Sequence, residues 1–520
     1  MDYNISEKRA LAAAILLALA FFAQGFFGNF KQSITFDETD FISAGYVYLT
    51  ESDFRLNPSQ PPFMQELEAF PLLFLNLEAP PYPSRWFSDR NPGLAYGNNF
   101  LFQSGNDARW IAFWARLPVL ILGALLILGI YLWGRRLFGA LPALAATAAA
   151  AFCPNLIAHS KVATADLGCT ALMFVAVWTF WLGWQKGRRR SWLLCGMITG
   201  LALLSKYTAL LLAPIYLVLT AWVLFKRNPE IKLMSALKAL AITGCVSIFV
   251  VGAGYNFSFD WPRYVSAVFK IYGEAVPDYK FYLLGMVSVK SWWYYNLVGL
   301  ATKVPVSTLL LFVIAAASCI YYRKDADRAM FLLAPAGIII ATSFFDKANI
   351  GLRRILPAFP FLLLFIAQGL GDGKNRLKLV VVVILLACTA SEAIRIYPYH
   401  LSYFNTIAGG PERGPYLFDD SNIDWGQDLP ALAEWQRSHP ESIPLKLFYL
   451  DTAAPSAYDV KAVRFDKSDI EHPKQGIYAV SVHILVAFRK YKAMTGADID
   501  WLTKYKPIAR AGYSIYIYKF

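Results

Sequence analysis

The sequence predicts an all-α polytopic membrane domain of about eleven transmembrane helices, followed by a small C-terminal α/β domain. Apolar runs of spanning length recur from Ala10 to Tyr397, and a bilayer core of about 30 Å needs roughly 20 apolar residues per helix. Charged residues make up only 16% of the chain, whereas soluble domains carry about 25%. The composition becomes that of a soluble protein from about Pro398 to Phe520. We therefore expect a membrane domain at 1–397 and a separate domain at 398–520.

The basic residues indicate the orientation of the chain in the membrane. The net charge is +13, but Lys and Arg lie in the gaps between apolar runs, as in cytoplasmic loops, and not on one nucleic-acid-binding domain. This pattern predicts a multi-pass protein of the bacterial inner membrane, with a cytoplasmic N-terminus and a periplasmic or extracellular C-terminal domain. All six cysteines lie within predicted helices, so neither a disulfide framework nor a cysteine-based metal site is expected.

The spans can be placed from the apolar runs. The stretch from Trp192 to Phe225 has basic loops at both ends, so it must cross twice, with Lys206 at the outer turn. The long first outer loop is expected at 31–109 and contains a short apolar surface helix, 63–77. A further outer loop is expected at 257–290. The other spans are predicted at 10–30, 110–134, 139–157, 167–184, 236–256, 304–322, 329–345, 355–370 and 379–397.

The C-terminal domain shows both kinds of secondary structure. The residues at 445–449, 477–483 and 513–519 alternate or run apolar, as strands do. The segment 429–437 has the pattern of a helix. The sequence therefore predicts a mixed α/β domain on the outer side of the membrane.

An acidic pair follows the first span directly. Asp37 and Glu38 are expected at the outer membrane surface, where a carboxylate could deprotonate a hydroxyl beside a lipid-borne substrate. The same two residues could equally cap the next helix, because acidic side chains favour a helix N-terminus. The sequence leaves both roles open.

Several cations are expected on the same face. Lys206 lies at a hairpin tip, Arg116 lies inside the second span, and Arg353 and Arg354 precede the tenth. Such residues can anchor a helix at the interface, or they can hold a phosphate. Cations that converge with a carboxylate pair favour a substrate that combines a phosphate with an acceptor.

Two other polar residues lie nearby. Asp166 begins the fourth span on the outer side, a few residues after His159. The acid could simply favour the helix N-terminus. The five histidines show no HExxH or similar ligand spacing, so no dedicated metal site is predicted. The chain also lacks a phosphate-binding glycine-rich loop, which argues against a nucleotide-driven pump.

Short motifs resemble those of the GT-C membrane glycosyltransferases. The closest similarity is to the superfamily that uses polyprenyl-phosphate sugars and includes protein O-mannosyltransferases and lipid A aminoarabinose transferases. The resemblance spans nearly the whole chain, and the motifs keep their order and their predicted outer-face placement. They are Asp37-Glu38, Gly45-Tyr46, Asn57-Pro58 with Pro61-Pro62, Arg116-Leu117-Pro118, 136–139, Ala163 with Asp166, Gly200 with 205–207, 349–357, 403–405 with 409–411, and 420–429.

The resemblance implies an inverting glycosyltransferase that needs no cofactor and takes its sugar from a polyprenyl-phosphate carrier. It implies that Asp37 is the catalytic base, that Glu38 supports either this base or the acceptor site, and that Lys206, Arg116 and Arg353 hold the phosphate. The acceptor would be a lipid, a glycan or a protein. The protein would also contact membrane lipids, and it would not bind nucleic acid. The further candidates for substrate binding are Arg354, Asp166, His159, Asn422 and Asp424.

Two features depart from the family pattern. The subgroup often has histidines where this chain has Phe41 and Gln60, which argues against a histidine-assisted role for this loop and leaves participation of a divalent cation open. The 420–429 motif could form an Asx turn that caps the next helix through Asn422 or Asp424. It could instead form a lip that touches the acceptor.

Two other classes of function compete with an enzyme. A transporter or flippase for lipid-linked sugars or polysaccharides would more often show polar or broken helices at the bilayer midplane, whereas these helix interiors are nearly free of charge. A membrane scaffold that presents the C-terminal domain would leave the acidic pair and Lys206 without a role. The sequence therefore favours an enzyme.

Overall fold

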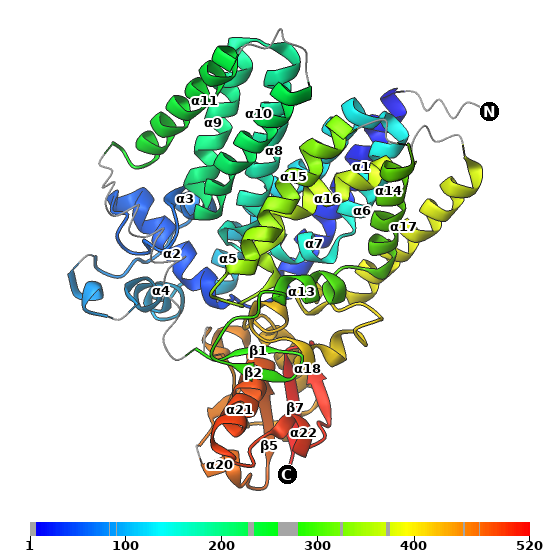
Figure 1. The fold of residues 1–520 in the computed structure, drawn as a ribbon. Helices are drawn as coiled ribbons and strands as arrows, with labels where there is room; N and C mark the ends of the chain where they lie inside the picture. Colours follow the sequence, from blue (N-terminus) through cyan, green and yellow to red (C-terminus); the bar gives the residue numbers. More distant parts are fainter. Residues whose placement is uncertain are drawn as a thin grey trace.

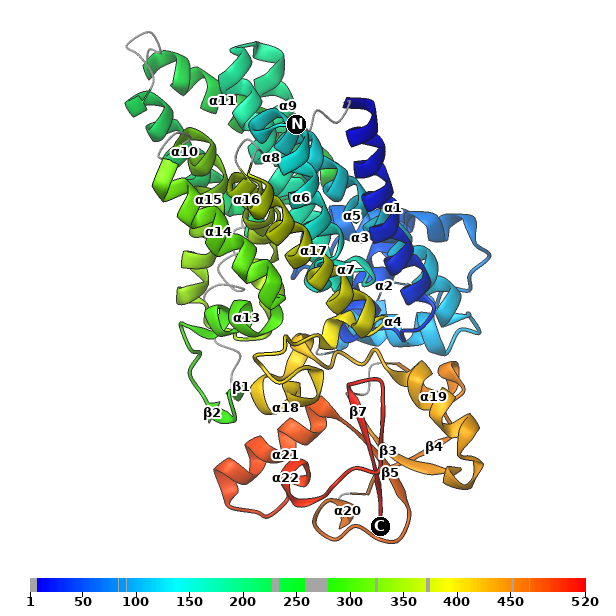
Figure 2. The same ribbon diagram turned by 90° about the vertical axis from the view of Figure 1, so that its right-hand side faces the viewer.

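The membrane helices and the C-terminal sheet occupy opposite ends of the molecule (Figure 1). The computed structural model describes residues 7–82, 84–89, 91–226, 233–257, 279–322, 326–370, 375–450, 453–466 and 468–520. Parts of the predicted basic loops and most of the predicted outer loop 257–290 lie outside these residues. The first helix begins at the end remote from the sheet, and a view turned by 90° shows the same arrangement (Figure 2).

The protein is a multi-pass membrane protein. Among the described residues, eight helices are long and apolar enough to cross a bilayer, or up to ten if two bent helix pairs each count as one span. A further helix, α9 (Arg189–Ser205), has 17 residues and lies at the predicted fifth span, but it is not among these candidate spans. The eight are α1 (Glu7–Asn29), α5 (Ala108–Phe138), α8 (Ala165–Lys186), η3 with α10 (Tyr207–Lys226), α11 (Leu233–Gly254), α15 with η4 (Ala326–Phe345), η5 with α16 (Leu352–Leu370) and α17 (Arg376–Ile396).

Proline divides one predicted span and precedes another. The predicted third span is α6 (Ala140–Ala151) followed by α7 (Pro154–Ser160), bent by 59°. The predicted eighth span, 304–322, corresponds to α14 (Val306–Tyr322), which follows α13 (Tyr295–Lys303) at a bend of 108°. Pro154 and Pro305 lie at these breaks. Proline lacks a backbone N–H and disfavours helix at the preceding residue, so the prediction of a continuous third span was wrong.

The predicted hairpin around Lys206 is confirmed. Helix α9 ends at Ser205, and Lys206 is extended, with φ −162° and ψ 143°. The chain then continues through η3 (Tyr207–Leu211) into α10 (Leu212–Lys226). Lys206 therefore lies at the turn between two spans.

The first outer loop folds into short helices against the membrane domain. They are α2 (Phe36–Glu51), α3 (Pro62–Ala69), η1 (Phe70–Phe74), η2 (Ser84–Ser88) and α4 (Pro92–Phe102). Helix α3 with η1 covers the predicted surface helix, and Phe70 and Phe74 are exposed on it. Gly45 of α2 permits close contact with α3, because a Cβ at Gly45 would lie 1.9 Å from the Gln65 carbonyl oxygen.

The C-terminal region contains a five-stranded mixed sheet with the order β4-β3-β5-β7-β6. Strand β3 (Leu445–Phe448) is parallel to β4 (Ala462–Arg464) and β5 (Ile477–Ser481), while β7 (Ile515–Lys519) is antiparallel to β5 and β6 (Ala509–Ala511). The three predicted strands correspond to β3, β5 and β7, and the predicted helix to α19 (Leu429–Ser438). Helices α18 (Gly414–Leu417), α20 (Ser468–Glu471), α21 (Val482–Thr495) and α22 (Trp501–Lys504) complete the region, and a hairpin, β1 (Phe281–Leu283) and β2 (Met286–Ser288), packs on it.

A connecting segment, residues 419–428, joins this region to the membrane helices. Its backbone bonds to the chain just ahead of α2: Ser33 N donates to Gln427 O at 2.9 Å, and Phe36 N donates to Trp425 O at 3.0 Å. From the membrane side, the buried Lys303 amine donates to the carbonyl oxygens of Leu401 (2.8 Å) and Asn422. The connecting segment therefore fixes where α2 begins.

Candidate active site

A cavity of about 610 Å³ lies where α2, the Lys206 turn and the start of η5 meet. Its lining includes four carboxyl groups, three cations and several apolar side chains. The charged lining residues are Asp37, Asp40, Asp166, Asp346, Lys206, Arg353 and Arg354. The apolar ones include Leu210, Leu211, Ile339 and Phe345, from the outer ends of the spans. This cavity combines the charges expected of a site for a phosphate-bearing lipid.

Asp37 faces the cavity from the first turn of α2. Its Oδ2 lies 2.6 Å from Arg353 Nη1, and its side chain is 24% exposed. The pair brings together residues that are 316 positions apart in the chain. Asp37 is therefore both accessible and held beside a cation.

Glu38 points the opposite way and is completely buried. Its carboxylate accepts five hydrogen bonds: from Thr35 N (2.8 Å) and Oγ1 (3.0 Å), Arg116 Nε (2.6 Å) and Nη2 (2.7 Å), and Ala163 N (2.8 Å). The bond to Thr35 N is the returning half of a capping box. Glu38 does not line the cavity, so the structure contradicts a role for it in contact with substrate. The sequence left open whether the Asp37–Glu38 pair acts as a base or caps the next helix. Glu38 is the residue that caps α2.

Arg116 is likewise buried, and its guanidinium donates to other groups of the protein. Besides Glu38, its guanidinium donates to Asn29 Oδ1 (3.0 Å), Gln32 O (3.3 Å) and Ser33 O (2.8 Å), and its side chain is 1% exposed. It does not line the cavity. The donors of Arg116 are bound to Glu38 and to the turn before α2, so this geometry does not support the prediction that Arg116 holds the donor phosphate.

Lys206 and Arg353 meet at a shared carboxylate. Lys206 Nζ lies 2.5 Å from Asp166 Oδ1, and Arg353 Nη1 lies 3.5 Å from Asp166 Oδ2. Asp166 is 2% exposed, whereas Lys206 and Arg353 are 17% and 13% exposed. Asp166 thus holds two cations at the cavity wall and leaves them partly open to a ligand.

Arg354 also lines the cavity, with Asp346 as its partner. Its Nη2 donates to Asp346 Oδ1 at 2.8 Å, and Nε pairs with the other carboxylate oxygen. Four of the predicted substrate-binding residues, Lys206, Arg353, Arg354 and Asp166, therefore surround one space with Asp37.

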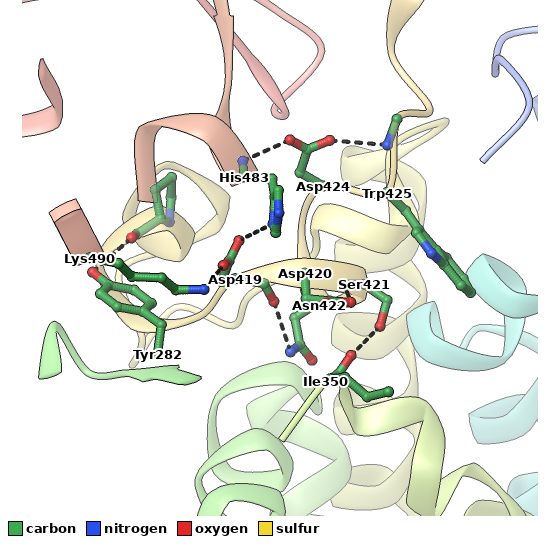
Figure 3. Close-up of polar contacts among 12 residues, drawn as sticks. Tyr282, Ile350, Asp419, Asp420, Ser421, Asn422, Asp424, Trp425, His483 and Lys490 are labelled. Carbon is green, nitrogen blue, oxygen red and sulfur yellow. Dashed lines mark hydrogen bonds and ion pairs between the residues drawn. The ribbon is translucent and has the colours of Figure 1, made fainter. Parts of the chain in front are cut away.

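The connecting segment supports Arg353 from outside the membrane domain. The Arg353 guanidinium carbon lies 4.4 Å from the centroid of the Trp425 ring, within the range of a cation–π contact. Asn422 Oδ1 accepts from Leu352 N at 3.0 Å, and Ser421 Oγ donates to Ile350 O at 2.6 Å (Figure 3). These contacts fix the backbone on both sides of Gly351 and hence the start of η5.

Asn422, Asp424 and His159 lie behind the cavity wall. Asn422 is 1% exposed and Asp424 is 0% exposed, and neither lines the cavity. Asp424 accepts from Gly426 N at 3.1 Å, which is an Asx turn, and from His483 N at 2.8 Å (Figure 3). His159 is buried beside Trp425, with the ring centroids 6.2 Å apart. The structure therefore contradicts direct substrate contact by these three residues, and neither Asn422 nor Asp424 caps the helix α19.

A second ionic cluster anchors α21 to the connecting segment. Asp419 Oδ1 lies 2.9 Å from His483 Nδ1, and Asp419 Oδ2 lies 2.6 Å from Lys490 Nζ (Figure 3). Burial opposes the charge on Asp419, but His483 and Lys490 outweigh it and hold its pKa below the usual range. Burial lowers the pKa of His483, yet Asp419 raises it to about 9. No pattern in the sequence indicates this cluster, because three strands, β3, β4 and β5, lie between Asp419 and His483 along the chain.

Asp40 is a lining residue that sequence reasoning missed. It lies one helical turn after Asp37, on the same face of α2. Burial, followed by the charge of Asp37, raises the pKa of Asp40 to about 8. The i, i+3 spacing from Asp37 was the signal that could have found it.

No group of three or more His, Cys, Asp or Glu residues in the described part of the chain is arranged to hold a metal ion. The four carboxylates of the cavity instead lie among three cations. The expectation that no cofactor is needed stays a prediction.

Comparisons with known proteins agree with this geometry. Residues 109–253, from α5 to α11, match the sequence family described as dolichyl-phosphate-mannose-protein mannosyltransferase. The structure is similar to that of ArnT from Cupriavidus metallidurans in the apo state, with a TM-score of 0.53, 14% identity and 97% of both chains covered. The chain has the GT-C glycosyltransferase fold.

The same GT-C fold occurs in a second, more distant match. It is the archaeal oligosaccharyltransferase AglB from Archaeoglobus fulgidus, in complex with an inhibitory peptide and a dolichol-phosphate. The TM-score is 0.51 at 12% identity, and the match covers 98% of this chain and 74% of that one. Comparison with curated protein sequences gives no significant match. The predicted class, a membrane glycosyltransferase of the GT-C fold, agrees with the sequence match and both structural matches.

Proposed function

We propose that the protein transfers a monosaccharide from a polyprenyl-phosphate carrier to an acceptor on the outer face of the bacterial inner membrane. The observation that carries this proposal is the meeting of Asp37 with Lys206 and Arg353 in one cavity that also has an apolar lining. The apolar lining suits the isoprenoid chain, and the cations suit its phosphate. The matched family's description, and the dolichol-phosphate in the AglB complex, support a lipid-linked donor.

The reaction is a single displacement. Asp37 takes the proton of the acceptor hydroxyl while the acceptor oxygen forms a bond to the anomeric carbon. The bond from that carbon to the phosphate oxygen breaks, and the phosphate leaves with the electron pair. Lys206 and Arg353 stabilise the charge that develops on the departing group. One displacement inverts the anomeric configuration.

The Asp37–Arg353 pair suggests how the base is released. Without a donor, Arg353 has Asp37 as its nearest carboxylate at 2.6 Å. A donor phosphate at Arg353 would replace Asp37 as counter-ion, because a guanidinium binds phosphate in the same bidentate way as a carboxylate. Donor binding would thereby free Asp37 to accept a proton.

The test is sugar transfer by the purified protein in lipid nanodiscs, with radiolabelled polyprenyl-phosphate monosaccharides and candidate acceptors. Asp37→Asn should lower the rate at saturating substrate by about 10²–10⁴-fold, the contribution usual for a general base. Lys206→Ala should raise the donor KM more than it lowers kcat. Glu51→Gln, an exposed carboxylate at the far end of α2, is the matched control and should match the parent.

Two outcomes would contradict the proposal. Transfer by Asp37→Asn at the parental rate would remove Asp37 as the base. An unchanged donor KM in Lys206→Ala would remove Lys206 from the phosphate site.

A further inference from the structure

The cavity has a second polar part, formed by residues that take no part in the proposed phosphate site. It is lined by Asp40 of α2, by Ser59 and Gln60 of the loop before α3, and by Asn91, the N-cap of α4. No Lys or Arg is among these residues. The phosphate site proposed above leaves this part of the cavity unused.

Two of its side chains hold oxygens whose hydrogen-bonding capacity is unmet. Asp40 Oδ1 and Gln60 Oε1 are buried and have no hydrogen-bond partner in the described part of the chain. Such groups are rare in folded proteins, because an unsatisfied buried polar atom costs about 1–3 kcal/mol. Both terminal torsions are broad and roughly two-fold, so either side chain can turn an oxygen toward a ligand in the cavity.

The position of Asp40 is fixed by close packing on α4. Gly93 lies in the first turn of that helix, and a Cβ there would come within 1.6 Å of Asp40 Oδ1. The glycine therefore makes room for this carboxyl group. Along α2, Asp37 contacts Arg353, and Asp40 lies one turn further on, toward α4.

Because Asp40 follows Asp37 by one turn along α2, the second polar part lies next to the proposed base and can take part in a displacement reaction. The leaving phosphate lies at Lys206 and Arg353, and the incoming hydroxyl must reach Asp37 from the side opposite to it. Asp40 and Gln60 line the same cavity as Asp37 but come from α2 and the loop before α3, whereas the two cations come from the Lys206 turn and from η5. They are therefore the lining groups available to an acceptor.

The protonation state of Asp40 indicates the kind of acceptor. Because its pKa is raised to about 8, the carboxyl group is largely neutral at pH 7. A neutral carboxyl group both donates and accepts hydrogen bonds, and so does each hydroxyl of a saccharide. A cationic acceptor would find no fixed negative charge at Asp40.

We propose that Asp40 and Gln60, packed against the Gly93 turn, form an acceptor subsite that binds the hydroxyl groups of a saccharide next to the hydroxyl that reacts. This inference rests on the proposed function, since it assigns the acceptor side of the same cavity.

The experiment compares saccharide acceptors that differ by one hydroxyl group, in the nanodisc assay with saturating donor. Asp40→Ala and Gln60→Ala should each raise the acceptor KM by about 3–10-fold, the effect of losing one neutral hydrogen bond, with the donor KM unchanged. Removing from the acceptor the hydroxyl that the mutated side chain binds should raise the acceptor KM of the parent by the same factor. It should not raise the acceptor KM of the variant any further.

Two variants separate binding from folding. Asp40→Asn keeps the size and the hydrogen-bonding atoms of the side chain and should retain an acceptor KM near that of the parent at pH 7. Gly93→Ala pushes Asp40 out of place without removing it and should raise the acceptor KM as Asp40→Ala does. Glu51→Gln again serves as the control.

The results distinguish this inference from the function on which it rests. An acceptor KM that stays at the parental value in Asp40→Ala and Gly93→Ala, while the parent transfers sugar, overturns the subsite alone. A rise confined to the donor KM, or transfer to a serine- or threonine-containing peptide and to no saccharide, also overturns it. Absence of transfer by the parent overturns the proposed function itself.

Discussion

Glu38→Gln should destabilise the protein, whereas Asp37→Asn should not. The Glu38–Arg116 pair is buried on both sides, with side-chain exposures of 0% and 1%. Removing one partner of a buried pair costs about 3–5 kcal/mol, because the other charge is left uncompensated. At 1.4 kcal/mol for each factor of ten, the folded-to-unfolded ratio should fall by two orders of magnitude or more.

The assay is thermal unfolding in detergent micelles, followed by tryptophan fluorescence and by size-exclusion profiles of heated samples. Glu38→Gln should lower the apparent melting temperature clearly. Asp37→Asn should leave it near the parental value, since Asp37 is partly exposed and Arg353 retains Asp166 at 3.5 Å. The double variant Glu38→Gln with Arg116→Gln should lose less stability than the sum of the single variants, because the two residues are in direct contact.

A clear outcome would refute this reasoning. If Glu38→Gln melts with the parent but no longer transfers sugar, Glu38 acts in the chemistry and not in the fold. Additive effects of Glu38→Gln and Arg116→Gln would show that the buried pair does not carry the stability assigned to it.

Two further predictions concern the C-terminal region and the first outer loop. Because Asp419 raises the pKa of His483 to about 9, its contribution, at most about 3 kcal/mol, is complete below pH 6.5 and lost as the pH rises through 9. The melting temperature should therefore fall between about pH 6.5 and 9 in the parent, and His483→Gln should remove that dependence; a parental pH profile in the variant would contradict the anchor. Gly45→Ala should destabilise by about 1–3 kcal/mol, because its Cβ would lie 1.9 Å from the Gln65 carbonyl oxygen. Gly129→Ala, whose Cβ would meet nothing closer than 3.7 Å, is the matched control, and equal melting temperatures for the two variants would refute the packing argument.

The hydropathy and charge of the sequence were enough to predict most of the spans. The turn at Lys206 followed from basic residues on both flanks, since orientation depends on where Lys and Arg lie. The break at Pro154 was not predicted, because an apolar run continues across it and only the backbone changes direction. Proline marks a possible break, but the neighbouring helices decide how far the chain bends there.

The sequence was enough to predict that the site residues lie on one face of the membrane domain. It did not predict the direction of each side chain. Asp37 and Glu38 are adjacent, and one step along a helix turns a side chain by about 100°. Arg116 decides the outcome, since its guanidinium binds Glu38 and so leaves Asp37 toward the cavity. The sequence places both Arg116 and Arg353 on the predicted outer face. Contacts between residues that are far apart in the chain determine that Arg353, and not Arg116, lines the cavity.

The bonds between residues 419–428 and the chain before α2 mean that the enzyme cannot be divided at the point where its composition changes. A protein truncated after residue 397 would keep every proposed reacting group yet lose Trp425 from above Arg353 and the carbonyl groups that hold residues 33–36. Exchanging this end of the chain between related enzymes should therefore alter how the base and the phosphate site are aligned. The C-terminal region is best treated as the support behind the cavity wall, because it holds Arg353 and the backbone beside it without lining the cavity.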